Sequence, residues 1–293
     1  SASNLANINR SYQLYEFSLP QYFAVFLNAS ISKPLSDRNV RYALNYATNR
    51  KEIINEVFQG RAESVEGPIL SWMPGYDPAL QSVYSLDKAK QILESGGWKD
   101  LDNDGILEKV LGKNEDPTPL KITLIVPSTD FLIQTASLLK KQWKEVGAEV
   151  EIKIVDSSDL QNNFLTTRLY DALLYGNIIN QKPDLFPFWH SSQKFYPGLN
   201  LSLYENASVD RFLEEARLTT NENQYKKALA NIQSLILADM PAIFLYNPKI
   251  LLIAPPSLHI ENLEKLDVSS ERYANVYRWY VKTKRVLTNS KSD

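Results

Sequence analysis

The stretch LKITLIVPSTDFLIQTASLLKKQWKEVGAEVEIKIV, residues Leu120–Val155, decides the fold class of this 293-residue chain. It opens with a continuous apolar run at Leu120–Val126, and Val150–Val155 alternates apolar and charged residues as a half-buried strand does. Between these runs, 128–146 places apolar side chains along one helical face and stops at Gly147. Strands that alternate with helices predict an α/β layer, with helices packed on a sheet.

The segments on either side fit the same layer. Tyr22–Leu27 is apolar throughout and predicts a buried strand, and Tyr170–Tyr175 and 241–246 predict two more. Helical spacing of apolar residues within 37–60, with a break at Thr48-Asn49-Arg50, predicts two consecutive helices. Further helices are expected at 85–94, 208–218 and 224–237. Proline-rich stretches at 61–85 and 176–206 predict long loops, which in compact domains often line a site.

Composition excludes several classes of function. Hydrophobic residues make up 44% and charged residues 23% of the chain, as in ordinary globular proteins. Lys plus Arg is 32 against 34 for Asp plus Glu, a net charge of −2, which argues against a nucleic-acid partner. Cysteine is absent and histidine occurs twice, so thiolate metal sites and histidine-rich relays are not expected. The chain begins Ser1-Ala2-Ser3, and we expect any targeting segment to lie outside it.

One acidic loop resembles the first half of a calcium site. Asp100, Asp102, Asp104 and Gly105 stand at the required spacing, but loop position twelve, where a bidentate carboxylate belongs, is Leu111. The incomplete pattern favours a polar hairpin turn with Gly105 in a left-handed conformation. Calcium binding by this loop is the open alternative.

Catalytic motifs are weak. The adjacent pair Glu214-Glu215 points in two directions on a helix, so it does not form a glycosidase pair facing one cleft. Trp189-His190-Ser191-Ser192 is the only stretch that suggests a serine–histidine site, and no Gly-x-Ser-x-Gly, Gly-x-Gly-x-x-Gly or P-loop occurs. We therefore expect a protein that is not an enzyme.

Aromatic residues on the predicted loops have two interpretations. They suit a concave ligand surface, or they cover the core of their own domain. The residues concerned are Trp72, Tyr76, Trp189, Phe195 and Tyr196.

Several motifs, taken in order, resemble one family. They are KPLSDRNVRYALNYATNRKEIINEVFQG at 33–60, SLDKAKQILESGGW at 85–98 with the following DLDNDG, LKITLIV and LLKKQWKEVGAEVEIKIV within 120–155, YDALLYG at 170–176, YENASVDRFLEEAR at 204–217, and QSLILADMPAIFLYNP at 233–248. The set resembles the C-terminal half of peptide/nickel-class solute-binding proteins of ABC importers, the dipeptide- and oligopeptide-binding proteins of family 5.

The resemblance implies a periplasmic-binding-protein-like lobe of class II, cluster C, in which helices flank a mixed sheet. Residues 21–247 would form the C-terminal ligand-binding lobe. Residues 1–20 and 248–293 would be segments, with partial strands, of the hinge and of a second, mostly absent lobe. Closure of two lobes on a ligand is a hinge motion driven by tighter binding to the closed form.

The resemblance also suggests where the ligand binds. In peptide receptors the loop after the YDA strand carries an acid that pairs with the peptide amino terminus. The corresponding position here falls near Ile179, and we expect Asp184 to cap the turn that follows. We therefore expect Asn177 and Asn180 to hydrogen-bond a neutral polar ligand, with Tyr175 or Trp189 stacking on it.

The implied partners are a small-molecule or peptide ligand and an ABC permease in the membrane. We expect a monomer in the periplasm or a cell-surface lipoprotein, with no cofactor, metal or nucleic acid. Two alternatives stay open: a ligand-sensing receptor module without transport, and a secreted hydrolase.

Overall fold

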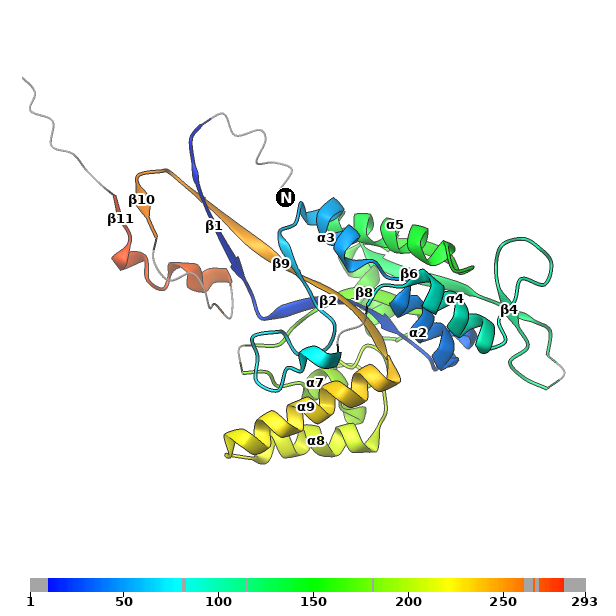
Figure 1. Cartoon of the computed structure of the whole chain (residues 1–293). Helices are drawn as coiled ribbons and strands as arrows, with labels where there is room; N and C mark the ends of the chain where they lie inside the picture. Colours follow the sequence, from blue (N-terminus) through cyan, green and yellow to red (C-terminus); the bar gives the residue numbers. More distant parts are fainter. Residues whose placement is uncertain are drawn as a thin grey trace, which may run out of the picture.

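The computed structural model describes residues 10–80, 83–113, 115–180, 182–260, 266 and 269–281. A mixed sheet with the strand order β1-β9-β2-β8-β6-β7 forms the centre, and β3 pairs with β9 (Figure 1). β6 is parallel to β7 and β8, and β2 is antiparallel to β8 and β9. The predicted α/β layer around a mixed sheet is confirmed. The strand bounds are β1 Gln13–Ser18, β2 Gln21–Leu27, β3 Ala62–Ser64, β6 Lys121–Pro127, β7 Glu149–Val155, β8 Ala172–Ile178 and β9 Ala242–Ala254.

Helices cover both faces of this sheet (Figure 1). The first face packs against α2 (Arg38–Tyr46), α3 (Arg50–Phe58), α4 (Leu86–Ser95) and α5 (Asp130–Lys144). The opposite face packs against α7 (Phe186–Trp189), α8 (Ala207–Leu218) and α9 (Glu222–Asp239). Shorter elements are α1 (Lys33–Ser36), α6 (Ser157–Asp159), β4 (Glu108–Lys109) and β5 (Thr118–Pro119). No described helix combines the length and the apolar character that crossing a bilayer requires.

Strand β2 shows why its sequence is apolar without alternation. Tyr22 and Phe26 point into the core under α7–α9, while Val25 and Leu27 point into the core under α2–α5. A strand that is covered on both faces buries every side chain, so it reads as a continuous apolar run.

Local capping chemistry sets the helix boundaries around residues 37–60. The Asp37 side chain accepts the Asn39 N–H at the start of α2, and the Asn49 side chain accepts the Glu52 N–H at the start of α3. The predicted break at Thr48-Asn49-Arg50 is confirmed, because a polar cap satisfies the free N–H groups of a new helix.

Asp37 also holds the hairpin that follows α4. Its Oδ2 accepts the Trp98 indole N–H at 3.0 Å and the Lys109 ammonium at 2.6 Å. Burial alone would raise the pKa of Asp37, but the hydrogen bonds from Lys109, from the Asn39 N–H and from Trp98 lower it overall.

We expect Asp37→Ala to destabilise the fold by about 2 kcal/mol at neutral pH, because it removes a helix cap and a charge-assisted bond together. The folded-state pKa is lower than the unfolded one, so this stabilisation is complete above about pH 4 and is lost as pH falls through the lowered value. Urea unfolding at pH 7 and at pH 3 measures both effects. The exposed first-turn residue Asp130 supplies the control, and Asp130→Ala should change stability by less than about 0.5 kcal/mol. A difference between wild type and Asp37→Ala that stays constant with pH would contradict this role.

Two strands differ from their predicted bounds. β8 starts at Ala172 rather than Tyr170, because Arg168 has a left-handed backbone (φ 61°) and the chain turns there. It also continues to Ile178, since Tyr22 of β2 pairs with Asn177. β9 continues past Tyr246 to Ala254, where its outer half pairs with β1.

The outer half of β9 and β1 form an arm that leaves the body of the molecule (Figure 1). Phe17, Leu19 and Leu266 form a small apolar cluster on this arm, separate from the two clusters of the body. Strands β10 (Leu258–His259) and β11 (Tyr280–Val281) pair at its far end. The assignment of 1–20 and 248–293 to another lobe stays a prediction, and 1–9, 261–265, 267–268 and 282–293 lie outside the described residues.

Candidate functional site

The carboxyl ends of β6 and β8 lie at the same edge of the sheet, since the two strands are parallel neighbours. Helix α5 begins beside this edge, and β2 enters the sheet there, with Gln21 opposite Ile178. In open α/β sheets, ligands bind outside the carboxyl ends of the strands. We call this region, from the end of β8 to the start of α5, the carboxyl edge.

The sequence suggested that Asn177 lies on the loop after β8. In the structure it lies inside the strand. It is 4% exposed, and its Nδ2 donates to the Tyr22 hydroxyl oxygen at 3.0 Å. Burial raises the pKa of Tyr22, and the neighbouring Asn177 and Trp189 side chains counteract part of that rise. Tyr22 is therefore neutral at physiological pH.

Tyr175 and Asn180 lie on either side of Asn177. Tyr175 is partly buried and shares a face of β8 with Asn177, because side chains two apart in a strand point the same way. Asn180 is exposed on the turn after β8, with a left-handed backbone (φ 60°) that asparagine tolerates better than most residues. The structure thus brings three of the four predicted residues together at the carboxyl edge.

Trp189 is different, because it is completely buried. Its ring packs against Phe26, Tyr204 and Phe244, with ring centroids 5.8–6.2 Å apart. In this structure Trp189 has no exposed face on which a ligand could stack in the way that was predicted. Of the two interpretations of the loop aromatic residues, Trp189 therefore fits the one in which they cover the core of their own domain. Its indole Nε1 has no hydrogen-bond partner among the described residues, which leaves a buried donor near Tyr22.

Partly buried aromatic rings cover the other side of the carboxyl edge. The ring centroids of Phe23 and Phe131 lie 5.2 Å apart, and those of Phe58 and the buried Tyr246 lie 4.6 Å apart. A Cβ added to Gly176 would lie 2.7 Å from the Phe23 ring, so only glycine fits beneath it. This aromatic group was not among the residues predicted from the sequence, although a glycine inside a strand is the signal of such a close approach.

Asp184 has the structural role that the sequence predicted. Its Oδ1 accepts the Phe186 N–H at 3.2 Å, which caps the turn before α7. It also pairs with Arg217 of α8 at 2.6 Å, and the Arg217 guanidinium stacks on the Phe186 ring. A carboxylate engaged in this way is not free to pair with a ligand amine.

The serine–histidine stretch caps the start of a short 3-10 helix, Ser191–Gln193. His190 Nδ1 lies 2.8 Å from Ser192 Oγ and also accepts the Ser192 backbone N–H at 3.1 Å. Asp210 accepts both the N–H and the hydroxyl of Ser191. In a serine–histidine–acid triad the histidine Nε2 bonds the nucleophilic hydroxyl, but His190 Nε2 has no hydrogen-bond partner among the described residues and Ser192 lies at Nδ1, so this geometry does not favour a hydrolase.

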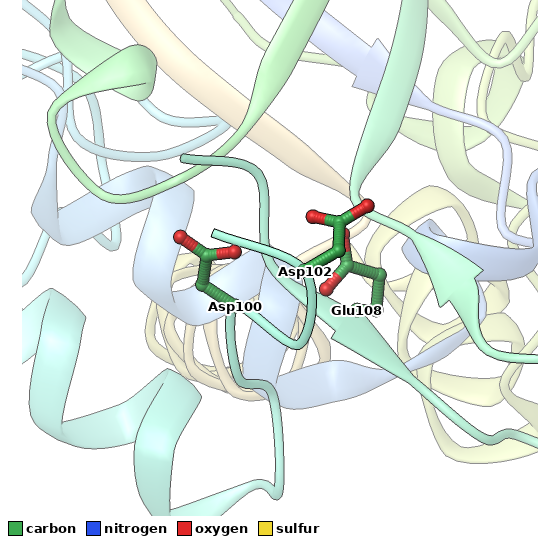
Figure 2. A group of neighbouring side chains, drawn as sticks. All are labelled: Asp100, Asp102 and Glu108. Atoms are coloured by element: carbon green, nitrogen blue, oxygen red, sulfur yellow. The ribbon is translucent and has the colours of Figure 1, made fainter. Parts of the chain in front are cut away.

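The acidic loop brings Asp100, Asp102 and Glu108 close together (Figure 2). One carboxylate oxygen from each of the three residues lies within 4.8 Å of the other two. Asp100 Oδ2 accepts the Gly105 N–H and Glu108 Oε2 accepts the Leu101 N–H, so backbone donors occupy them. Gly105 is left-handed (φ 88°), as predicted for a polar hairpin turn.

Comparisons with known proteins agree with one family. A family model described as bacterial extracellular solute-binding proteins, family 5 (middle region), matches residues 2–196. The oligopeptide-binding protein AppA of Bacillus subtilis is 32% identical over 252 residues, which cover 84% of this chain and 44% of that protein. The probable D,D-dipeptide-binding periplasmic protein DdpA of Escherichia coli is 26% identical over 231 residues, or 76% of this chain and 40% of that protein.

Solved structures show the same fold. The structure of AppA from Bacillus subtilis in complex with a nonapeptide superposes with a TM-score of 0.78 at 26% identity, covering 96% of this chain and 54% of that one. NikZ from Campylobacter jejuni in complex with Ni(L-His) gives a TM-score of 0.78 at 24% identity, covering 96% and 55%. This chain therefore spans about half the length of the relatives that it matches.

Proposed function

We propose a function from the premise that this chain belongs to the bacterial extracellular solute-binding proteins of family 5. It forms one lobe of a two-lobe, non-catalytic receptor that encloses a solute at the carboxyl edge and delivers it to an ABC permease. The receptor works outside the cytoplasm as a monomer. The named relatives are binding proteins, which supports binding rather than turnover.

The observation that carries this proposal is the arm. β9 belongs to the body through β2 and then continues into a second packing unit with β1, and this unit has its own apolar cluster of Phe17, Leu19 and Leu266. The arm leaves the body from the end of β2 where Tyr22 and Asn177 lie. A strand shared between two units is a connection about which they can close on a ligand.

The solute is a neutral polar molecule or a peptide whose recognised part carries no free amine. At the carboxyl edge, Asn180 contacts the solute directly and Tyr175 contributes to the wall of the site. Asn177 holds Tyr22 in place beneath it. Two facts support a neutral ligand: the position expected to be acidic is Ile179, and Asp184 is paired with Arg217.

Asn180→Gly in the full-length receptor tests this site, because glycine keeps the left-handed backbone and removes only the amide. We expect ligand affinity to fall about tenfold, the effect of one lost hydrogen bond, while stability changes by less than about 0.5 kcal/mol. Titration calorimetry with the molecule that co-purifies with the receptor, identified by native mass spectrometry, measures the affinity.

Asn103→Gly is the matched control, since Asn103 is also exposed and left-handed (φ 65°) but lies on the acidic hairpin away from the carboxyl edge. Its affinity should equal that of the wild type. Equal affinity for both variants would remove Asn180 from the site. Turnover of the bound molecule would overturn the non-catalytic proposal.

A further inference from the structure

Apolar side chains of β2, β8 and α5 meet at the carboxyl edge, close to Asn180. The Phe23 ring lies over Gly176 and against Phe131, and all three residues are partly buried. Ile178, the last residue of β8, is 55% exposed. It shares a face of β8 with Gly176, because side chains two apart in a strand point the same way. We call Phe23, Phe131 and Ile178 the apolar wall.

The two rings of the wall are held in place by other aromatic rings. Tyr246 of β9 stacks on Phe23, with the ring centroids 5.7 Å apart, and Phe58 of α3 lies 5.8 Å from Phe131 by the same measure. Tyr246 is itself fixed, because its hydroxyl oxygen lies 2.8 Å from that of Thr135. Rings that are held in this way lose little conformational freedom when a ligand binds, which favours binding.

The strands that contribute to the wall carry no charge. Residues 21–27 and 172–180 contain no Asp, Glu, Lys, Arg or His, and the residue of β2 that lies opposite Ile178 is the neutral Gln21. Asp130, the residue before Phe131, is exposed to solvent. An apolar group that covers such a surface gains the free energy of removing apolar area from water. An ionised group would lose hydration there without gaining a counter-ion, so the wall suits an uncharged group.

The wall has two candidate covers, the solute and the second lobe that the proposed function requires. Asn180, which contacts the solute under that proposal, follows Ile178 by two residues, so their backbones are at most about 7 Å apart. A solute that bonds the Asn180 amide therefore lies within reach of the Ile178 side chain. The second lobe would have to insert a side chain between the solute and the wall to cover it instead. The position of the wall beside Asn180 thus favours the solute as its occupant.

We propose that the apolar wall binds an uncharged apolar group of the solute, such as a leucine-sized side chain, an assignment that rests on the proposed function. The solute is then amphipathic: its neutral polar part bonds Asn180, and its apolar part lies on Phe23 and Ile178. Asn180 alone selects weakly, because an amide bonds both donors and acceptors. The wall supplies the selection among neutral solutes.

The test uses the full-length receptor and two blocked tripeptides, N-acetyl-Gly-Leu-Gly-amide and N-acetyl-Gly-Ser-Gly-amide. They differ only in the central side chain, and neither has a free amine. In titration calorimetry we expect the wild type to bind the leucine peptide at least about tenfold more tightly, because the wall removes its apolar side chain from water. Ile178→Ser should reduce this ratio of affinities at least about threefold, and Phe23→Ser should bring it to about one.

Ile31→Ser is the matched control, because Ile31 is 44% exposed and follows the end of β2 that lies away from the carboxyl edge. Its ratio of affinities should equal that of the wild type. The ratio is the readout because a change in stability or in lobe closure alters both affinities alike. If Phe23→Ser does not fold, Ile178→Ser still decides, since replacing an exposed side chain costs little stability.

Three outcomes overturn the assignment of the wall. Equal affinities of the wild type for the two peptides show that the wall does not contact the solute. A fall of both affinities by the same factor in Ile178→Ser assigns the wall to the second lobe. If only the co-purified molecule binds, it should carry an apolar group and bind Ile178→Ser at least about threefold more weakly, and failure of either expectation overturns the assignment. A receptor that binds neither peptide and no co-purified molecule contradicts the proposed function itself, which the other outcomes leave intact.

Discussion

Trp189→Ala is expected to lower the free energy of unfolding by about 4 kcal/mol, the usual cost of removing a buried tryptophan ring. The ring is completely buried among Phe26, Tyr204 and Phe244, so the substitution leaves a cavity in the core beneath α7–α9. Stability of a whole domain is only about 5–15 kcal/mol, so the variant should unfold at a much lower urea concentration. Far-UV circular dichroism is the suitable probe, because the mutation removes a fluorophore.

Trp72→Ala is the matched control, since Trp72 is 43% exposed on the 61–85 loop. It should change stability by less than about 0.5–1 kcal/mol. If Trp189→Ala were as stable as Trp72→Ala, the ring would not be part of the core. Retention of ligand affinity by folded Trp189→Phe would separate its packing role from any contact with the solute.

The second large effect concerns the second lobe that the proposed function requires. This 293-residue chain alone is expected to bind the solute at least about 100-fold more weakly than the full-length receptor, because one edge covers a ligand on one side only. Ligand sites bury most of the ligand surface, and a half-covered ligand gains too little to offset the entropy that it loses on association. Calorimetry with the same co-purified molecule compares the two proteins directly.

The comparison has its own control. Far-UV circular dichroism and urea unfolding should show that the chain alone is folded, so that weak binding reflects the missing surface and not a disordered lobe. Equal affinities of the two proteins would show that the whole site lies within this chain. The arm would then have no role in closing over the solute.

The positions of helices and strands followed from short-range features of the sequence. The break before Arg50 was predictable because Asn49 is a good cap, and the helix at 130–144 was predictable from its apolar face and from Gly147. These features act within a few residues of each other along the chain, so a linear pattern contains them.

The candidate site was predictable only in part. Asn180 and Tyr175 lie at the carboxyl edge, but Asn177 is buried in the strand against Tyr22, which is 155 residues away in the sequence. The aromatic group around Phe23 was missed because its residues come from four separate elements, β2, α3, α5 and β9. No local pattern records which distant segment will cover a given side chain.

The sequence by itself determined an α/β layer of the family 5 type, the helix caps, the glycine turns and the absence of thiol chemistry. Only the tertiary structure decided that Trp189 lies in the core and that Asp184 forms an ion pair with Arg217. It also decided that Arg168 holds an exposed apolar loop, which carries Phe195 and Tyr196, and that β9 continues into the arm. The physical reason is that caps and periodicity act between near neighbours in the chain. Burial and pairing depend on which distant segments pack together, and the folded structure fixes those contacts.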